Sequence, residues 1–341
     1  MLSKMSENLF QRAISQSGSA LSPFAFQPNP RAKAEELGRK LNLKFNSTED
    51  LVNQLRNVSF QTLKAAENGL FSMDQPLGLR AFDFVPSMET EDSIEERFLT
   101  DTPIELMRNG EFNQVPFIMG FTNNEGLMMI RQNEIDNQVF ERFNQNDSNY
   151  VPVSYNLESN SSDNSEVAKA FRELYFDGKN PSANNLPGWA KYNTDHQFQF
   201  PIDRTIKYFI ANQSNPIYYY TFEIEGSFNI LKRILFLQRY EGACHADDIF
   251  YLFTPIVPIP VWPLDHALTL RRRLIRMWTN FAKTGNPTPY TDSLVNTLWP
   301  EYTIEGENYM GIGGNLQVKR MPKNGALKVW HDFQQRFTGH Q

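Results

Sequence analysis

Two polar loops of the sequence carry side chains that could work together as an acid and a base. Residues 121–126 read FTNNEG and contain Glu125, and residues 241–248 read EGACHADD and contain His245. An imidazole can take a proton from a serine hydroxyl, while a carboxylate fixes the tautomer of that imidazole and stabilises its charged form. The pattern is that of nucleophilic acyl transfer, with Glu125 as the acid and His245 as the base.

Other interpretations of these residues stay open at this point. A glutamate before a glycine is often a solvated turn residue, and His245 could stand at the start of a helix with Asp247 and Asp248 in its first turn. A metal site on His245, Asp247 and Asp248 is disfavoured because no second histidine lies at ligand spacing. Cys244 is disfavoured as a nucleophile, because a residue next to its own base rarely presents both groups to one substrate.

The sequence has no segment that would present a nucleophilic serine. None of its 18 glycines begins a Gly-x-Ser-x-Gly turn, and the Ser17-Gly18-Ser19 segment has the wrong spacing for one. The only glycine pair is Gly313-Gly314, so a His-Gly-Gly-Gly stretch for an oxyanion hole is also absent. These 341 residues therefore hold a candidate acid and base without a nucleophile.

The two loops must be positioned by the elements that precede them. Short apolar runs alternate with helical patterns, which predicts an α/β fold with parallel strands, and loops after the carboxyl ends of such strands carry catalytic groups. Residues 145–165, rich in Asn and Ser, are predicted to be a surface loop. We predict strands at 12–16, 115–120, 217–222 and 308–312, and helices at 29–41, 265–283 and 326–337.

Composition narrows the partners and the compartment. The formal charge is −6, and the one basic run, Arg271–Arg273, is interpreted as a solvated helix face, so no nucleic-acid partner is predicted. No apolar segment is long enough for a membrane span. The single cysteine favours the cytoplasm. Five Asn-x-Ser/Thr triplets favour the alternative, secretion, and begin at Asn46, Asn57, Asn146, Asn160 and Asn212.

Five segments together resemble the type-B carboxylesterase (cholinesterase-like) family, and the chain is most similar in character to the intracellular α-esterases of insects. These segments occur in family order at 9–18 (LFQRAISQSG), 120–126 (GFTNNEG), 242–248 (GACHADD), 281–287 (FAKTGNP) and 299–303 (WPEYT). The resemblance implies an α/β-hydrolase fold and a Ser-Glu-His triad.

Five positions of this sequence take roles from that resemblance. Glu125 and His245 fall on the acid and base positions of the triad. Ser17 falls where the family hydrogen-bonds the triad glutamate, Asp248 matches a buried carboxylate, and Phe24 falls where many relatives place a tryptophan that lines the acyl pocket. No cofactor and no metal are implied.

The resemblance also predicts what these residues leave out. In the family, the serine turn and the oxyanion glycines precede the segment that matches 9–18, so we expect residues 1–341 to be an N-terminally truncated, C-terminal portion of a single α/β-hydrolase domain, without its first strands. Secreted relatives carry a cysteine pair in the region matching 41–56, and its absence here favours an intracellular protein.

The expected function is hydrolysis of a small-molecule carboxylic ester through an acyl-enzyme. The residues present are expected to be inactive alone. The alternative is an inactive pseudoenzyme or an interaction protein of the same family, since the family includes adhesion members that lost the triad. The sequence specifies neither the ester nor the oligomeric state.

Overall fold

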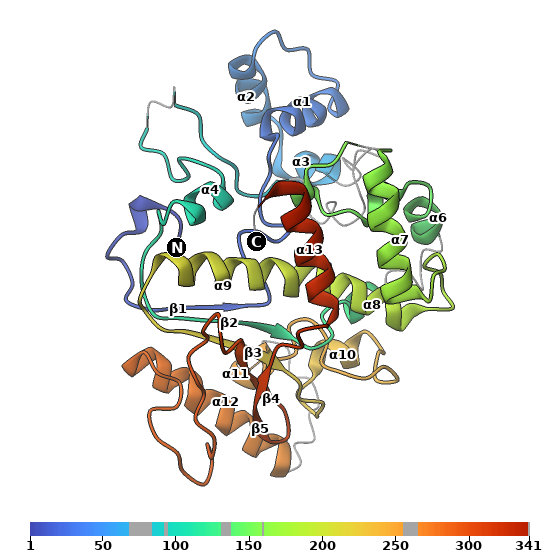
Figure 1. The fold of residues 1–341 in the computed structure, drawn as a ribbon. Helices are drawn as coiled ribbons and strands as arrows, with labels where there is room; N and C mark the ends of the chain where they lie inside the picture. Colours follow the sequence, from blue (N-terminus) through green and yellow to red (C-terminus); the bar gives the residue numbers. More distant parts are fainter. Residues whose placement is uncertain (68–83, 92–94, 131–137, 159, 255–264, 340–341) are drawn as a thin grey trace.

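A mixed five-stranded sheet in the order β1-β2-β3-β4-β5 forms the centre of the fold in the computed structural model (Figure 1). The structure describes residues 1–67, 84–91, 95–130, 138–158, 160–254 and 265–339. Neighbouring strands from β1 to β4 are parallel, and β5 runs antiparallel to β4. The strands are β1 Ala13–Gln16, β2 Phe117–Thr122, β3 Ile217–Phe222, β4 Asn308–Ile312 and β5 Leu316–Arg320.

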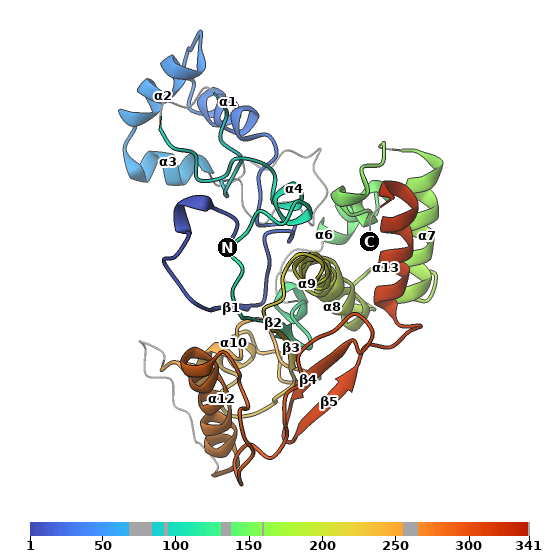
Figure 2. The ribbon, with the colours of Figure 1, turned by 60° about the vertical axis from the view of Figure 1, so that its left-hand side comes forward.

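Helices cover both faces of this sheet. Every residue of β2 and β3 is buried, which is why these strands are almost continuously apolar. Figure 2 shows α9 (Phe200–Asn212) and α12 (Asp265–Thr284) on opposite sides of the strands. Ile202 and Ile206 of α9 pack with one face of the sheet, and Leu274 and Phe281 of α12 pack with the other.

The remaining helices form satellites around this core. Helix α13 packs through Trp330 with α7 and α8 in a second aromatic cluster, and its His331 Nε2 lies 2.6 Å from Asp203 Oδ2 on α9. The first three α-helices stand apart from the sheet in both views (Figures 1 and 2). Besides α9 and α12, the described helices and helical turns are η1 Lys4–Ser6, α1 Pro30–Lys40, α2 Thr48–Arg56, α3 Phe60–Glu67, α4 Pro103–Arg108, α6 Gln138–Phe143, η3 Asp147–Tyr150, η4 Val153–Tyr155, α7 Ser162–Phe176, α8 Leu186–Thr194, the π-helical turn η5 Asp195–Gln199, α10 Ile230–Ile234, α11 Ile249–Leu252 and α13 Ala326–Thr338.

The four predicted strands and three predicted helices are confirmed within two residues, but other predictions were wrong. Strand β5 was not predicted, because it is an exposed edge strand with one well-buried residue. The predicted loop 145–165 contains η3, η4 and the start of α7, since Tyr150 and Tyr155 are buried in the aromatic cluster. Arg273 is not on a solvated face: it is buried and donates to the carbonyls of Leu294 and Gly314.

No helix among the described residues combines the length and the apolar character that crossing a membrane would require.

Candidate active site

Three loops at the carboxyl ends of neighbouring strands bring the predicted site residues together. Ser17 follows β1 directly, Glu125 lies three residues beyond β2, and His245 lies in the loop between α10 and α11, which come after β3. The backbone N–H of Ser17 donates to the carbonyl of Gly120 over 2.8 Å, which fixes the β1 loop on β2. Because β1, β2 and β3 are parallel neighbours, these three loops emerge at one edge of the sheet.

Hydrogen bonds join the glutamate loop to the histidine loop. The N–H of Ala243 donates to Asn123 Oδ1 (2.7 Å), and the N–H of Asn124 donates back to the carbonyl of Ala243 (3.1 Å). Gly242 has a φ of +88°, and a Cβ atom there would come within 2.9 Å of the Asn124 Cβ. The asparagine pair and the glycine therefore hold the two loops at a fixed separation, which explains the Asn-Asn-Glu-Gly and Gly-Ala-Cys-His patterns.

Glu125 is a fully buried carboxylate with both oxygens occupied. Its Oε1 accepts hydrogen bonds from Ser17 Oγ and from the Thr122 N–H, each at 2.6 Å, and its Oε2 lies 2.6 Å from His245 Nδ1. Donors of this kind stabilise the ionised form of a carboxylate that burial would otherwise neutralise. The alternative of a solvated turn residue is excluded, because Glu125 is 0% exposed.

His245 combines a fixed ring with partial access to solvent. Its side chain is 30% exposed, and the Phe198 ring packs beside it at 5.2 Å between centroids. Burial lowers the pKa of His245, but the hydrogen bond and charge of Glu125, together with the charges of Asp248 and Asp247, more than offset this effect and leave the pKa above its usual value. Since Glu125 engages Nδ1, Nε2 is the ring nitrogen left for proton transfer.

Asp248 lies behind the histidine, in a buried position that solvent does not reach. Its Oδ2 accepts from Gln16 Nε2 (2.6 Å) and from the Tyr220 hydroxyl (3.2 Å), while its Oδ1 has no hydrogen-bond partner. Burial, together with the charge of Glu125, raises the pKa of Asp248 to about 6. This carboxyl group is therefore close to half protonated at mildly acidic pH.

Asp247 organises the histidine loop, which the sequence did not indicate. It accepts from the backbone N–H of Cys244 and from Asn229 Nδ2, both at 2.8 Å, and from the N–H of Lys232. Helix α11 begins only at Ile249, so neither aspartate acts as a first-turn acid after a histidine at a helix start. The sequence could not show this role, because two of the partners of Asp247, Asn229 and Lys232, are distant in sequence and come near it only in the fold.

Two other candidate chemistries receive no support from the site. Cys244 is fully buried, and burial followed by the charge of Asp247 raises the pKa of its thiol, so the thiol stays protonated. The described residues include no group of three or more His, Cys, Asp or Glu side chains that could hold a metal ion.

Two aromatic residues link the loop after β1 to the histidine. Phe24 packs on Phe198 at 5.4 Å between ring centroids, and Phe198 in turn packs on His245. Phe198 was not predicted as a site residue. The π-helical turn at Asp195–Gln199 contains Phe198.

Comparison with known protein families decides the lineage. The model of the carboxylesterase family matches residues 1–330. The chain belongs to the carboxylesterase family. It is 27% identical to juvenile hormone esterase of Tribolium castaneum over 94% of this chain and 57% of that protein. It is 28% identical to human bile salt-activated lipase over 96% of this chain and 42% of that protein. It is also 28% identical to human neuroligin-3 over 96% of this chain and 38% of that protein.

The solved structures support the same fold. The structure of juvenile hormone esterase from Manduca sexta matches with a TM-score of 0.80 and 23% identity, over 99% of this chain and 62% of that one. The predicted α/β-hydrolase fold is confirmed by this match. The chain spans about half the length of the curated relatives it matches.

Proposed function

We propose that the chain carries the acid and the base of a Ser-Glu-His triad that hydrolyses uncharged, small-molecule carboxylic esters. The observation that carries the proposal is the 2.6 Å contact between His245 Nδ1 and Glu125 Oε2, whose carboxylate is held from the other side by Ser17 and the Thr122 N–H. Membership in the carboxylesterase family supports the reaction class. No cofactor takes part in this chemistry.

The proposed mechanism gives each group one task. His245 Nε2 takes the proton of a serine hydroxyl as the serine oxygen attacks the ester carbonyl, and Glu125 stabilises the imidazolium that forms. The imidazolium gives its proton to the departing alcohol, which leaves an acyl-serine. Water then attacks the acyl group, with His245 again acting as the base, and the carboxylic acid is released.

The serine of this mechanism is proposed to lie outside Met1–Gln341, since no Gly-x-Ser-x-Gly turn occurs within these residues. Loss of a triad nucleophile removes several orders of magnitude of rate, and oxyanion donors contribute further. We therefore expect the 341-residue chain by itself, like its His245→Ala variant, to hydrolyse p-nitrophenyl butyrate no faster than the same solution without protein. Activity of the unmodified chain that survives His245→Ala would show that these site residues are misassigned.

A second experiment tests the source of the nucleophile. We expect the transcript upstream of the Met1 codon to encode an in-frame Gly-x-Ser-x-Gly turn, and the protein translated from it to hydrolyse p-nitrophenyl butyrate. In that protein, Glu125→Gln should lower kcat by about 10⁴-fold, the size of the effect when a triad carboxylate becomes an amide. The control is Glu241→Gln, on the exposed part of the histidine loop. Equal rates for the two variants would contradict the proposal.

The pH profile provides an independent readout of the same site. The base must be neutral to accept a proton, and Glu125 holds the pKa of His245 above its usual value. The rate should therefore rise with pH, and the midpoint of this rise should lie above the ordinary pKa of histidine, which is about 6.5. In the Glu125→Gln variant the midpoint should fall, because the stabilising charge is lost. A midpoint that does not move would contradict the pairing.

The alternative is an inactive pseudoenzyme or interaction protein of the same family. The absence of the serine turn from these residues favours it, and the match to neuroligin-3 extends over 96% of the chain. A transcript that starts translation at Met1 would support this alternative and exclude the esterase.

We also propose a cytoplasmic location, supported by a single cysteine that is buried and unpaired. The five glycosylation triplets test this proposal, because at least Asn46, Asn57 and Asn160 are exposed and would be modified in the secretory pathway. The protein from its native cells should keep its mobility on a gel after treatment with peptide N-glycosidase F. A mobility shift would favour secretion.

A further inference from the structure

A cavity of about 360 Å³ lies against the 20–28 segment. Its walls come from that segment, the start of α4, the region of η4 and the junction of η5 with α9. This volume falls in the range of about 300–1,000 Å³ that is typical of small-molecule sites. Most of the wall is apolar, with Leu21, Phe26, Ile104 and Phe200 among its residues.

Among the described residues of that wall, Arg204 carries the one cationic side chain, and none of them forms an ion pair with this buried guanidinium. It is 2% exposed, and its Nε and Nη2 atoms have no hydrogen-bond partner. In the described part of the chain no carboxylate forms an ion pair with it. Its neighbours are the hydroxyl groups of Tyr208 and Tyr155, the guanidinium of Arg108 and the ring of Phe200, whose centroid lies 5.5 Å from its Cζ. A buried cation of this kind is costly unless an anion accompanies it.

His196 adds a second unpartnered polar group to the same wall. It is 3% exposed, its Nδ1 has no hydrogen-bond partner, and its ring stacks on Trp330 at 5.6 Å between centroids. Burial lowers the pKa of His196 to about 4, so the ring is neutral at pH 7. It lies in the π-helical turn η5, and such turns are frequent at functional sites.

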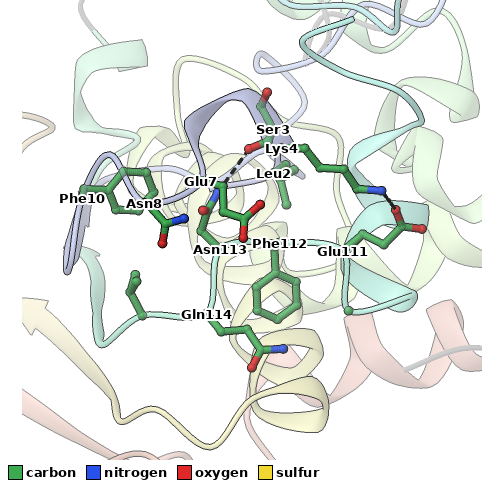
Figure 3. A pocket seen from close by; sticks show the side chains of 12 residues that line it. Leu2, Ser3, Lys4, Glu7, Asn8, Phe10, Glu111, Phe112, Asn113 and Gln114 are labelled. Carbon is green, nitrogen blue, oxygen red and sulfur yellow. Dashed lines mark hydrogen bonds and ion pairs between the residues drawn. The ribbon is translucent and has the colours of Figure 1, made fainter.

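A second cavity, of about 440 Å³, has no buried, unpaired charge in its wall and serves as a comparison. It lies between the N-terminal segment and residues 110–115 (Figure 3). Two of its charged side chains, Lys4 and Glu111, face each other, with Nζ and Oε2 3.0 Å apart, and the third, Glu7, is exposed. Lys4 is also largely exposed, so this cavity has no buried charge that calls for a ligand.

We propose that the Arg204 cavity binds a monocarboxylate with an apolar body. The planar guanidinium matches the two oxygens of a carboxylate and would receive the counter-charge that the described residues do not supply. Leu21, Ile104 and Phe200 would cover the apolar body of the ligand. The cavity is separate from the proposed triad, because neither His245 nor Phe198 lines it.

The experiment measures binding of octanoate, octan-1-ol and inorganic phosphate to the 341-residue chain by titration calorimetry at pH 7. Octanoate should bind at least ten-fold more tightly than octan-1-ol, which has the tail without the charge, and than phosphate, which has the charge without the tail. Arg204→Met should lose at least ten-fold in octanoate affinity, while its unliganded Tm should not fall, because the variant removes an unpaired buried charge. Arg39→Met, at a largely exposed guanidinium, is the matched control and should bind octanoate normally.

The His245→Ala variant separates this site from the proposed active site, and it should bind octanoate as the unmodified chain does. Loss of binding in His245→Ala would place octanoate in the active site and overturn the proposal. The proposal would also be overturned if octan-1-ol or phosphate bound as tightly as octanoate, or if Arg204→Met bound octanoate normally. The ligand comparison uses the unmodified chain, so it decides the question even if Arg204→Met fails to fold. Ester hydrolysis plays no part in these measurements.

Discussion

The contact between Ser17 and Glu125 offers the sharpest test of the site, because it joins an uncharged donor to a fully buried carboxylate. Ser17 Oγ lies 2.6 Å from Glu125 Oε1, and Ser17→Ala removes one of the two donors to that oxygen. A hydrogen bond to a charged group contributes about 1.5–3 kcal/mol, against about 0.5–1.5 kcal/mol for a neutral pair. We therefore expect Ser17→Ala to lower the free energy of unfolding by about 2–3 kcal/mol at pH 7.

The matched control, Ser15, lies two residues earlier, on strand β1. Ser15 Oγ donates to the neutral carbonyl of Gly18 at 2.7 Å, so Ser15→Ala should cost only about 1 kcal/mol. A double-mutant cycle then isolates the charge: in a Glu125→Gln background, Ser17→Ala should also cost only about 1 kcal/mol. Urea unfolding followed by tryptophan fluorescence gives all four free energies, with the slope m confirming that the unfolded states are comparable.

The predicted coupling between Ser17 and Glu125 is thus about 1–2 kcal/mol, which exceeds the additivity error of about 0.3–0.5 kcal/mol. A coupling inside that error would refute the argument that Ser17 stabilises an ionised Glu125. So would a loss in Ser17→Ala no larger than the loss in Ser15→Ala.

Three further outcomes follow from the same region. Gly126→Ala should lower stability by about 3 kcal/mol in thermal unfolding, because a Cβ would meet the Ala190 carbonyl oxygen at 2.0 Å. Gly314→Ala should be neutral, because the nearest atom to its Cβ would be His266 Nε2 at 3.9 Å, an ordinary contact distance. The pKa of Asp248 rises from 3.8 to about 6 on folding, so the native state binds more protons than the unfolded state between these pH values. The free energy of unfolding should therefore fall as pH rises from about 4 to 6. In Asp248→Asn the urea midpoint should depend less on pH in this range, and an unchanged dependence would contradict the assignment. Cys244 should react with Ellman's reagent only after unfolding, and labelling of the native chain would contradict its burial.

Local patterns in the sequence were sufficient for most of the sheet. Strands β3 and β4 have the predicted bounds. In β3 the reason is local, because IYYYTF is a short run of β-branched and aromatic residues, which is typical of a buried strand. Strand β5 escaped prediction, since LQVKR is polar at an exposed edge and its place is set by pairing with β4. The 145–165 segment was misinterpreted because its buried tyrosines stand between two stretches rich in Asn and Ser, which are typical of exposed loops.

The sequence by itself determined which side chains could be an acid and a base, because residue type and motif order are local properties of the chain. Only the tertiary structure decided that Ser17 and Glu125, 108 residues apart, and Glu125 and His245, 120 residues apart, meet within hydrogen-bond distance. It also decided that Arg204 is buried with no carboxylate of the described residues paired to it, which nothing in its local sequence shows. The physical reason is that burial and pairing depend on the order and register of strands, and these are set by long-range packing.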